Sequence, residues 1–290
     1  MVQFDEDEDN GRLFGSCDGV AVDDDGVIYS IAVYTDGEGY NSYVYRASDV
    51  GDRLAPNVQT ELLDVQLWLT SIWRSETGSL YVADADGNVR RYDGAAWTVT
   101  PVSAQALTCI WGLSDTDVYV AGDEGIVYRW DGTVWSSFSP PLGGVIFSVR
   151  GVSARNLYAC GANALLWHFD GTWTQIVLPT NQRLLGLLAL AANDVLVCGA
   201  GGVLFRGADA SWNDVSQPGH DFHSPADYRG VIYLSGGGEG VFRFDGTAVT
   251  NIKNTITSYR LVSNASYLAS AGGVVAARFD GQSWFGARYS

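Results

Sequence analysis

Residues 107–141 read LTCIWGLSDTDVYVAGDEGIVYRWDGTVWSSFSPP, and the fold can be inferred from this stretch. It contains four short runs of β-branched and aromatic residues. The runs are separated by Ser114–Asp117, Gly122–Gly125 and Asp131-Gly132, which are turn-forming sequences. The pattern predicts four strands joined by tight turns. One such sheet cannot bury both of its faces alone, so it needs similar sheets on either side.

The same unit recurs along the chain. The clearest marker is an aromatic-Asp-Gly sequence, present in five good copies and one worn copy whose aspartates are Asp93, Asp131, Asp170, Asp209, Asp245 and Asp280. Successive aspartates are 38, 39, 39, 36 and 35 residues apart. A seventh unit lies upstream, where residues 27–29 match 118–120 and residues 43–46 match 126–129. Repeats of this length without a helical period predict an all-β fold, a seven-bladed β-propeller of four-stranded antiparallel blades.

We expect one domain over residues 13–290, preceded by an acidic lead-in at residues 1–12. The predicted blades span approximately 13–66, 67–105, 106–144, 145–182, 183–219, 220–255 and 256–290. The last unit has its own candidate fourth strand at residues 283–288, so the two ends of the ring are expected to meet by face packing. Residues 2–4 are a candidate clasp at this junction.

Charge excludes some functions. The chain has 33 acidic and 17 basic residues, a formal net charge of −16. This balance opposes binding to nucleic acid or to anionic membranes, which depends on clustered Lys and Arg. It favours capture of a basic protein partner, although an acidic surface also simply maintains solubility.

The sequence also bears on compartment, oligomeric state and cofactors. It lacks a signal-peptide pattern and an apolar run of membrane-spanning length, so a cytoplasmic monomer is expected. The four cysteines stand in apolar strand contexts and are interpreted as small buried hydrophobes. They do not stand at metal-ligand spacing, and no cofactor is predicted.

Two residue types recur at fixed places in the repeat. A tryptophan follows the Asp at Trp97, Trp135, Trp173, Trp212 and Trp284, where we expect it to seal neighbouring blades. A basic residue recurs in every unit, two residues before the Asp in the clean copies, at Arg46, Arg91, Arg129, His168, Arg206, Arg243 and Arg278. A group needed once in each blade indicates a repeated hydrogen bond or ion pair rather than a polyanion-binding stripe.

The aromatic-Asp-Gly-x-x-Trp pattern resembles the Asp-box hairpin of sialidase-like and related bacterial propellers, and the resemblance covers almost the whole chain. It departs from the Asp-box because Asp and Gly are adjacent, which suits a two-residue type I′ turn. The blades also lack the Gly-His and Trp-Asp endings of WD repeats. The sialidase branch of the resemblance implies glycoside chemistry, but its arginine cluster and catalytic residues cannot be assigned here.

Binding in a propeller is expected where loops of different blades converge around the axis. One face carries the loops between blades and the loops joining second and third strands. The candidate binding residues on this face are mostly acidic, with one tryptophan: Trp68, Asp84, Asp86, Asp123, Glu124, Arg183, His220 and Glu239. The alternative interpretation is a set of solvated turns.

The inner strands offer a second set of candidates. Trp73, Trp111, Arg150 and Arg260 align at one position, and the tryptophans suit core packing. A buried arginine needs a partner, so the two arginines are either paired inside or directed into the central channel. His220 and His223 share one loop and allow a metal only with a third ligand from another blade. No catalytic residue or metal ligand is assigned.

These observations predict a non-catalytic protein-binding propeller that engages a basic protein through its acidic loop face. Examples of such a role are an assembly factor and a partner that neutralises a toxin. The alternative is glycan recognition, lectin-like or hydrolytic in the sialidase manner. A third possibility is a purely architectural part of a larger assembly.

Overall fold

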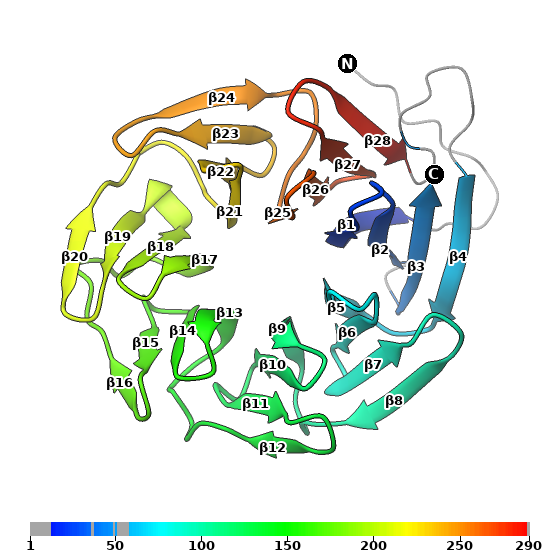
Figure 1. The fold of residues 1–290 in the computed structure, drawn as a ribbon, viewed down its shortest axis with the longest axis horizontal. Helices are drawn as coiled ribbons and strands as arrows, with labels where there is room; N and C mark the ends of the chain where they lie inside the picture. The colour runs from blue at the N-terminus through cyan, green and yellow to red at the C-terminus, as the bar shows by residue number, and fades with distance from the viewer. Residues whose placement is uncertain (1–12, 36–37, 49, 51–57, 289–290) are drawn as a thin grey trace.

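The computed structural model describes the chain except residues 1–12, 36–37, 49, 51–57 and 289–290. The described residues form a closed ring of seven four-stranded antiparallel sheets around a central axis (Figure 1). This confirms the predicted all-β, seven-bladed propeller. The acidic lead-in and the candidate clasp at residues 2–4 lie outside the described residues.

Each blade is a meander whose strands run in chain order from the axis to the rim (Figure 1). Blades 1 and 2 comprise β1 (Leu13–Val22), β2 (Ile28–Thr35), β3 (Tyr40–Ser48), β4 (Val58–Val65), β5 (Leu69–Arg74), β6 (Leu80–Asp84), β7 (Asn88–Tyr92) and β8 (Trp97–Pro101). Blades 3 and 4 comprise β9 (Leu107–Ser114), β10 (Asp117–Gly122), β11 (Val127–Trp130), β12 (Trp135–Ser137), β13 (Ile146–Ser153), β14 (Asn156–Gly161), β15 (Leu166–Phe169) and β16 (Trp173–Gln175). Blades 5 to 7 comprise β17 (Leu184–Ala191), β18 (Asp194–Gly199), β19 (Leu204–Ala208), β20 (Ser211–Asp214), β21 (Ser224–Tyr228), β22 (Val231–Ser235), β23 (Val241–Phe244), β24 (Val249–Lys253), β25 (Arg260–Ser263), β26 (Leu268–Gly272), β27 (Val275–Phe279) and β28 (Trp284–Arg288). A 3-10 turn, η1 (Ala200–Gly202), lies within the second hairpin of blade 5.

The core consists of seven apolar clusters, and each cluster joins two neighbouring blades. Second strands are buried on both faces because they lie between adjacent sheets. Cys160 in β14 and Cys198 in β18 are fully buried at equivalent places, and all four cysteines are buried and unpaired, as expected. The repeated tryptophans also act as predicted: the indole N–H of Trp97 donates to the carbonyl of Leu62 in the preceding blade at 2.8 Å.

The Asp-Gly hairpins differ from the predicted turn type. Gly132 has φ +97°, and Gly94 and Gly281 have φ +99°, but the residue after each glycine has a negative φ. A positive φ at the first central position alone is the requirement of a type II′ turn, so the type I′ prediction is wrong. The Asp carboxylate explains the difference, because it accepts the backbone N–H groups on the far side of the turn, as Asp131 does from Thr133 and Val134 at 2.8 and 2.9 Å.

Among the described residues, the repeated basic residue forms the expected ion pair within its own blade in two cases, and His168 lies 3.2 Å from the carboxylate of Asp209 in the next blade. Arg129 pairs with Asp117 at 2.7 Å, and Arg206 forms two 2.7 Å hydrogen bonds with Asp194. In both blades the carboxylate begins the second strand. These pairs tie the second and third strands together within one blade, which supports a structural role.

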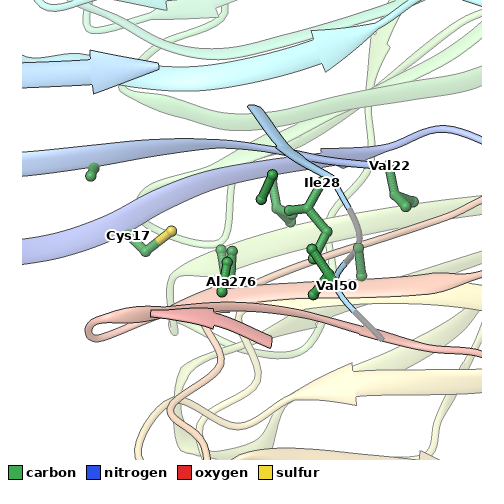
Figure 2. Close-up of a cluster of buried hydrophobic side chains, with 11 residues drawn as sticks. Cys17, Val22, Ile28, Val50 and Ala276 are labelled. Carbon is green, nitrogen blue, oxygen red and sulfur yellow. The ribbon is translucent and has the colours of Figure 1, made fainter. Parts of the chain in front are cut away.

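The ring closes by face packing between blades 1 and 7, as predicted. Each of these blades contains its own four strands. Cys17, Val22 and Ile28 of blade 1 pack with Ala276 of blade 7 in one buried cluster (Figure 2). The backbone N–H of Cys17 also donates to the carbonyl of Gly273 at 2.7 Å. Closure therefore requires no exchange of strands between the ends.

Candidate protein-binding face

One face of the ring carries the loops between blades together with the loops that join second and third strands. The antiparallel meander dictates this, because each inner strand begins and each second strand ends on the same side of the blade. We call this side the loop face. All eight predicted binding residues lie in or beside its loops.

Trp68 is an exposed anchor on the loop face. Its side chain lies between blades 1 and 2, is 40% exposed and stacks on Tyr40, whose exposed fraction is 46%, with ring centroids 5.2 Å apart. The indole N–H donates to the carboxylate of Asp18 at 2.9 Å, which fixes the ring. A groove of about 370 Å³, lined by Tyr34, Tyr40 and other residues, borders this pair. An aromatic pair held in place at an open groove is suited to contact a partner.

A third exposed aromatic lies on the same face, directly before the inner strand of blade 7. Tyr259 is 40% exposed in the loop before β25 and packs edge-to-face on His223, with centroids 4.9 Å apart. The next residue, Arg260, donates from Nε to the carbonyl of Asp18 at 3.3 Å. Asp18 therefore connects Trp68 with the segment that carries Tyr259.

His220 and Glu239 are brought together on blade 6. The Nδ1 atom of His220 lies 2.9 Å from a carboxylate oxygen of Glu239, and both side chains remain partly exposed. The imidazole ring packs 4.9 Å from the ring of Phe242. This pair gives the loop face a positioned polar group in blade 6.

Asp84 does not belong to the accessible face. Its side chain is fully buried at the end of β6, where it forms an ion pair with Arg90 at 3.2 Å. It also accepts the backbone N–H groups of Asp86 and Asn88 at 3.0 and 2.8 Å. The carboxylate organises its own turn and is not available to a partner, which corrects the expectation for this residue.

The remaining predicted residues lie on separate blades. Asp86, Asp123 and Arg183 are exposed, in blades 2, 3 and 5 respectively. Glu124 is partly exposed and accepts a hydrogen bond from the hydroxyl of Tyr128 at 2.7 Å. These charges surround the mouth of the channel and do not form one cluster.

Exposed aromatics distinguish the loop face from the opposite face better than acidity does. The opposite face also carries acids, but Asp117 pairs with Arg129, and Asp115 accepts a hydrogen bond from the hydroxyl of Tyr81 at 2.9 Å. Among the described residues, Tyr40, Trp68 and Tyr259 are the three exposed aromatic side chains, and all lie on the loop face. Sequence reasoning missed Tyr40 and Tyr259. The available signal was that both stand outside the repeated aromatic positions.

The central channel contains the two inner-strand arginines. Arg150 and Arg260 both line a cavity of about 40 Å³ on the axis, which resolves the alternatives left by the sequence in favour of the channel. The predicted alignment is wrong for Arg260: it is opposite Ala271, whereas Arg150 is opposite Tyr158. Cys160 and Ser270 occupy equivalent positions in the second strands of their blades. Measured from that position, Arg260 lies nearer the loop face than Arg150 does.

Neither a metal centre nor a membrane span is found in the part of the chain that the structure describes. No three His, Cys, Asp or Glu side chains come together there in a way that could hold a metal ion. Helices long and apolar enough to cross a membrane are absent from the same residues.

Comparison with known proteins gives one curated relative by sequence. It is the immune protein Tsi7 of Pseudomonas aeruginosa, 29% identical over 147 residues, which is 47% of each chain. The chain thus matches about half the length of this relative. No protein-family model matches the sequence.

Solved structures with the same fold are more distant in sequence. The WD40 propeller of Doa1 superposes with a TM-score of 0.75 over 94% of this chain and 96% of that chain, at 12% identity. Virginiamycin B lyase from Staphylococcus aureus gives 0.72 over 90% and 94%, also at 12% identity. YCF48 bound to a D1 peptide gives 0.58 over 76% and 81%, again at 12% identity. At this level of identity the similarities show the propeller fold alone.

Proposed function

We propose that this propeller is a non-catalytic immunity-type protein that neutralises a basic protein toxin by binding it through the loop face. The observation that carries the proposal is the fixed aromatic pair of Trp68 and Tyr40, exposed beside a groove on the face where loops of different blades meet. The half-length similarity to the immune protein Tsi7 supports the choice of a toxin as partner. The peptide-bound propeller YCF48 illustrates that this fold can present a peptide-binding surface.

The chemistry of the face suits such a partner. Aromatic side chains remove a large apolar area from water at little entropic cost, and they dominate the binding energy of many interfaces. The hydrogen bond from Trp68 to Asp18 orients the indole before binding. Exposed carboxylates at Asp86, Asp123 and Glu239 lie on the same face, in blades 2, 3 and 6, and would steer a basic partner toward it.

Replacing Trp68 tests the proposal. Proteins that co-purify with the wild-type chain from its native cell would be identified, and the affinity of each for wild type and Trp68→Ala would be measured. We expect Trp68→Ala to weaken binding of the toxin by about 2 kcal/mol or more, roughly 30-fold in Kd, because the complex loses an aromatic side chain that binding would bury. Val134→Ala is the matched control, since Val134 is 56% exposed on the opposite face.

Two further readouts separate the parts of the proposal. Expression of the wild-type chain should restore growth of cells producing the captured protein, and Trp68→Ala should restore it less well. A captured protein that is not toxic would contradict the immunity role. A Kd that does not change with salt would contradict the electrostatic contribution, because exposed charge pairs are screened.

A further inference from the structure

The central channel holds positive charge that the loop-face proposal does not use. Inner strands of blades 2 to 7 line the cavity on the axis, and three basic side chains contribute to its wall: Arg150 from β13, Arg260 from β25 and His223 just before β21. This is a concentration of basic groups at the centre of a chain whose formal net charge is −16. The hydroxyl-bearing residues Ser71, Ser148 and Thr108 line the same cavity.

The protein itself does not neutralise these guanidinium groups. Among the described residues, neither Arg150 nor Arg260 forms a salt bridge. Arg150 donates from Nη1 to the carbonyl of its neighbour Val149 at 2.8 Å and lies 5.9 Å from the ring of Trp111. Arg260 donates from Nε to a backbone carbonyl, that of Asp18. A guanidinium has five N–H donors, so the contacts described leave most of them available to the channel.

The nearest carboxylates are engaged elsewhere. Asp18 is the acid whose charge raises the pKa of Arg260. Its carboxylate accepts hydrogen bonds from the indole of Trp68 and the hydroxyl of Ser16. Asp221, near His223, accepts the backbone N–H of Gly201 at 2.7 Å. The channel therefore keeps a positive potential that these acids only partly offset.

The pKa directions agree with this geometry. Burial lowers the pKa of Arg150, and the charge of Arg260 lowers it further. Burial likewise lowers the pKa of His223, with additional lowering from Arg260 and Arg183 and partial opposition from Asp221. The lowered pKa favours the neutral form of His223, whereas the two arginines remain charged. Two like charges facing a narrow channel are stabilised by an anion between them.

We propose that the channel is a binding site for one small oxyanion, a carboxylate or a phosphate group, held by Arg150 and Arg260. Guanidinium groups match the two-oxygen edge of these anions with paired hydrogen bonds. The cavity of about 40 Å³ has room for about three water molecules, enough for such a group and too little for a sugar ring. This site is independent of the loop-face function.

Titration of the purified protein with inorganic phosphate and with acetate tests the proposal. Calorimetry and thermal unfolding would be run against sodium chloride at matched ionic strength, because chloride controls for screening. We expect phosphate, acetate or both to bind with one site per chain and to raise the unfolding temperature more than chloride does. The relative effect of the two ions identifies whether the site prefers phosphate or carboxylate.

Substitutions locate the site. Arg150→Gln and Arg260→Gln should each weaken binding of the preferred ion at least about tenfold, which corresponds to about 1.4 kcal/mol. Arg155→Gln is the matched control, because Arg155 is exposed in the same blade as Arg150 but on the opposite face. If Arg150→Gln does not fold, Arg260→Gln provides the same comparison. Equal binding by all variants, or an effect of both ions no larger than that of chloride, would overturn the proposal.

Discussion

At the scale of single residues, two aspartates of one turn differ in their exposure to solvent. Asp84 and Asp86 stand in the same Asp-Ala-Asp-Gly sequence, yet Asp84 is fully buried and Asp86 is exposed. The other blades provide the explanation, because Gly122, Gly161 and Gly199 occupy the position of Asp84. That position lies against the backbone of the preceding inter-blade loop, so a side chain placed there is enclosed.

The first prediction concerns this buried carboxylate. Asp84→Ala should lower the free energy of unfolding by about 3–5 kcal/mol, because it leaves the mostly buried guanidinium of Arg90 without its counter-ion. Asp86→Ala should change it by no more than about 0.5 kcal/mol, as is usual for an exposed turn residue. Denaturant titration of the two variants provides the measurement. Similar losses in both would show that the ion pair is not what stabilises the turn.

At the scale of the element, the Asp-Gly hairpin is held together by its own side chain. The Asp131 carboxylate accepts the hydroxyl of Thr133 at 2.7 Å in addition to two backbone N–H groups. Asp93, Asp245 and Asp280 form equivalent backbone contacts in their blades. Recurrence of the aspartate therefore reflects turn formation in each blade, not a shared binding site.

This geometry predicts a pH dependence. Hydrogen bonds from the hydroxyl of Thr133, then from the N–H groups of Val134 and Thr133, lower the pKa of Asp131 to about 2. As the pH falls, the unfolded chain binds this proton first, at a pKa of about 3.9. The contribution to stability is therefore complete above about pH 5 and is lost as the pH falls toward 2. The difference in unfolding temperature between wild type and Asp131→Ala should accordingly be widest at neutral pH and shrink on acidification. A difference that stays constant down to pH 2 would contradict the assignment.

At the scale of the whole molecule, the repeat predicted the architecture because every blade must satisfy the same packing requirements. Those requirements concern positions that recur, such as Trp97 and Cys160, so they can be recognised in the sequence. A binding face depends on residues that do not recur, and the sequence cannot tell which of them are enclosed. Trp68 and Tyr259 each stand directly before an inner strand, at Leu69 and Arg260, and outside the repeated aromatic positions, but only Trp68 was recognised. The position of Arg260 was misjudged because the seventh blade departs from the spacing of the others.

The closed ring carries the last prediction. Ile28 is fully buried in the cluster that joins blade 1 to blade 7, and Ile252 is 38% exposed on the outer strand of blade 6. Ile28→Ala should lower the free energy of unfolding by about 2–5 kcal/mol, because it removes apolar contact and leaves a cavity between the blades. Ile252→Ala should change it by no more than about 0.5 kcal/mol. Since each blade buries its faces only against its two neighbours, loosening this junction removes support from both ends of the ring. Calorimetry of Ile28→Ala should therefore show one transition at a lower temperature, and a separate early transition would mean that the ends part before the other blades unfold.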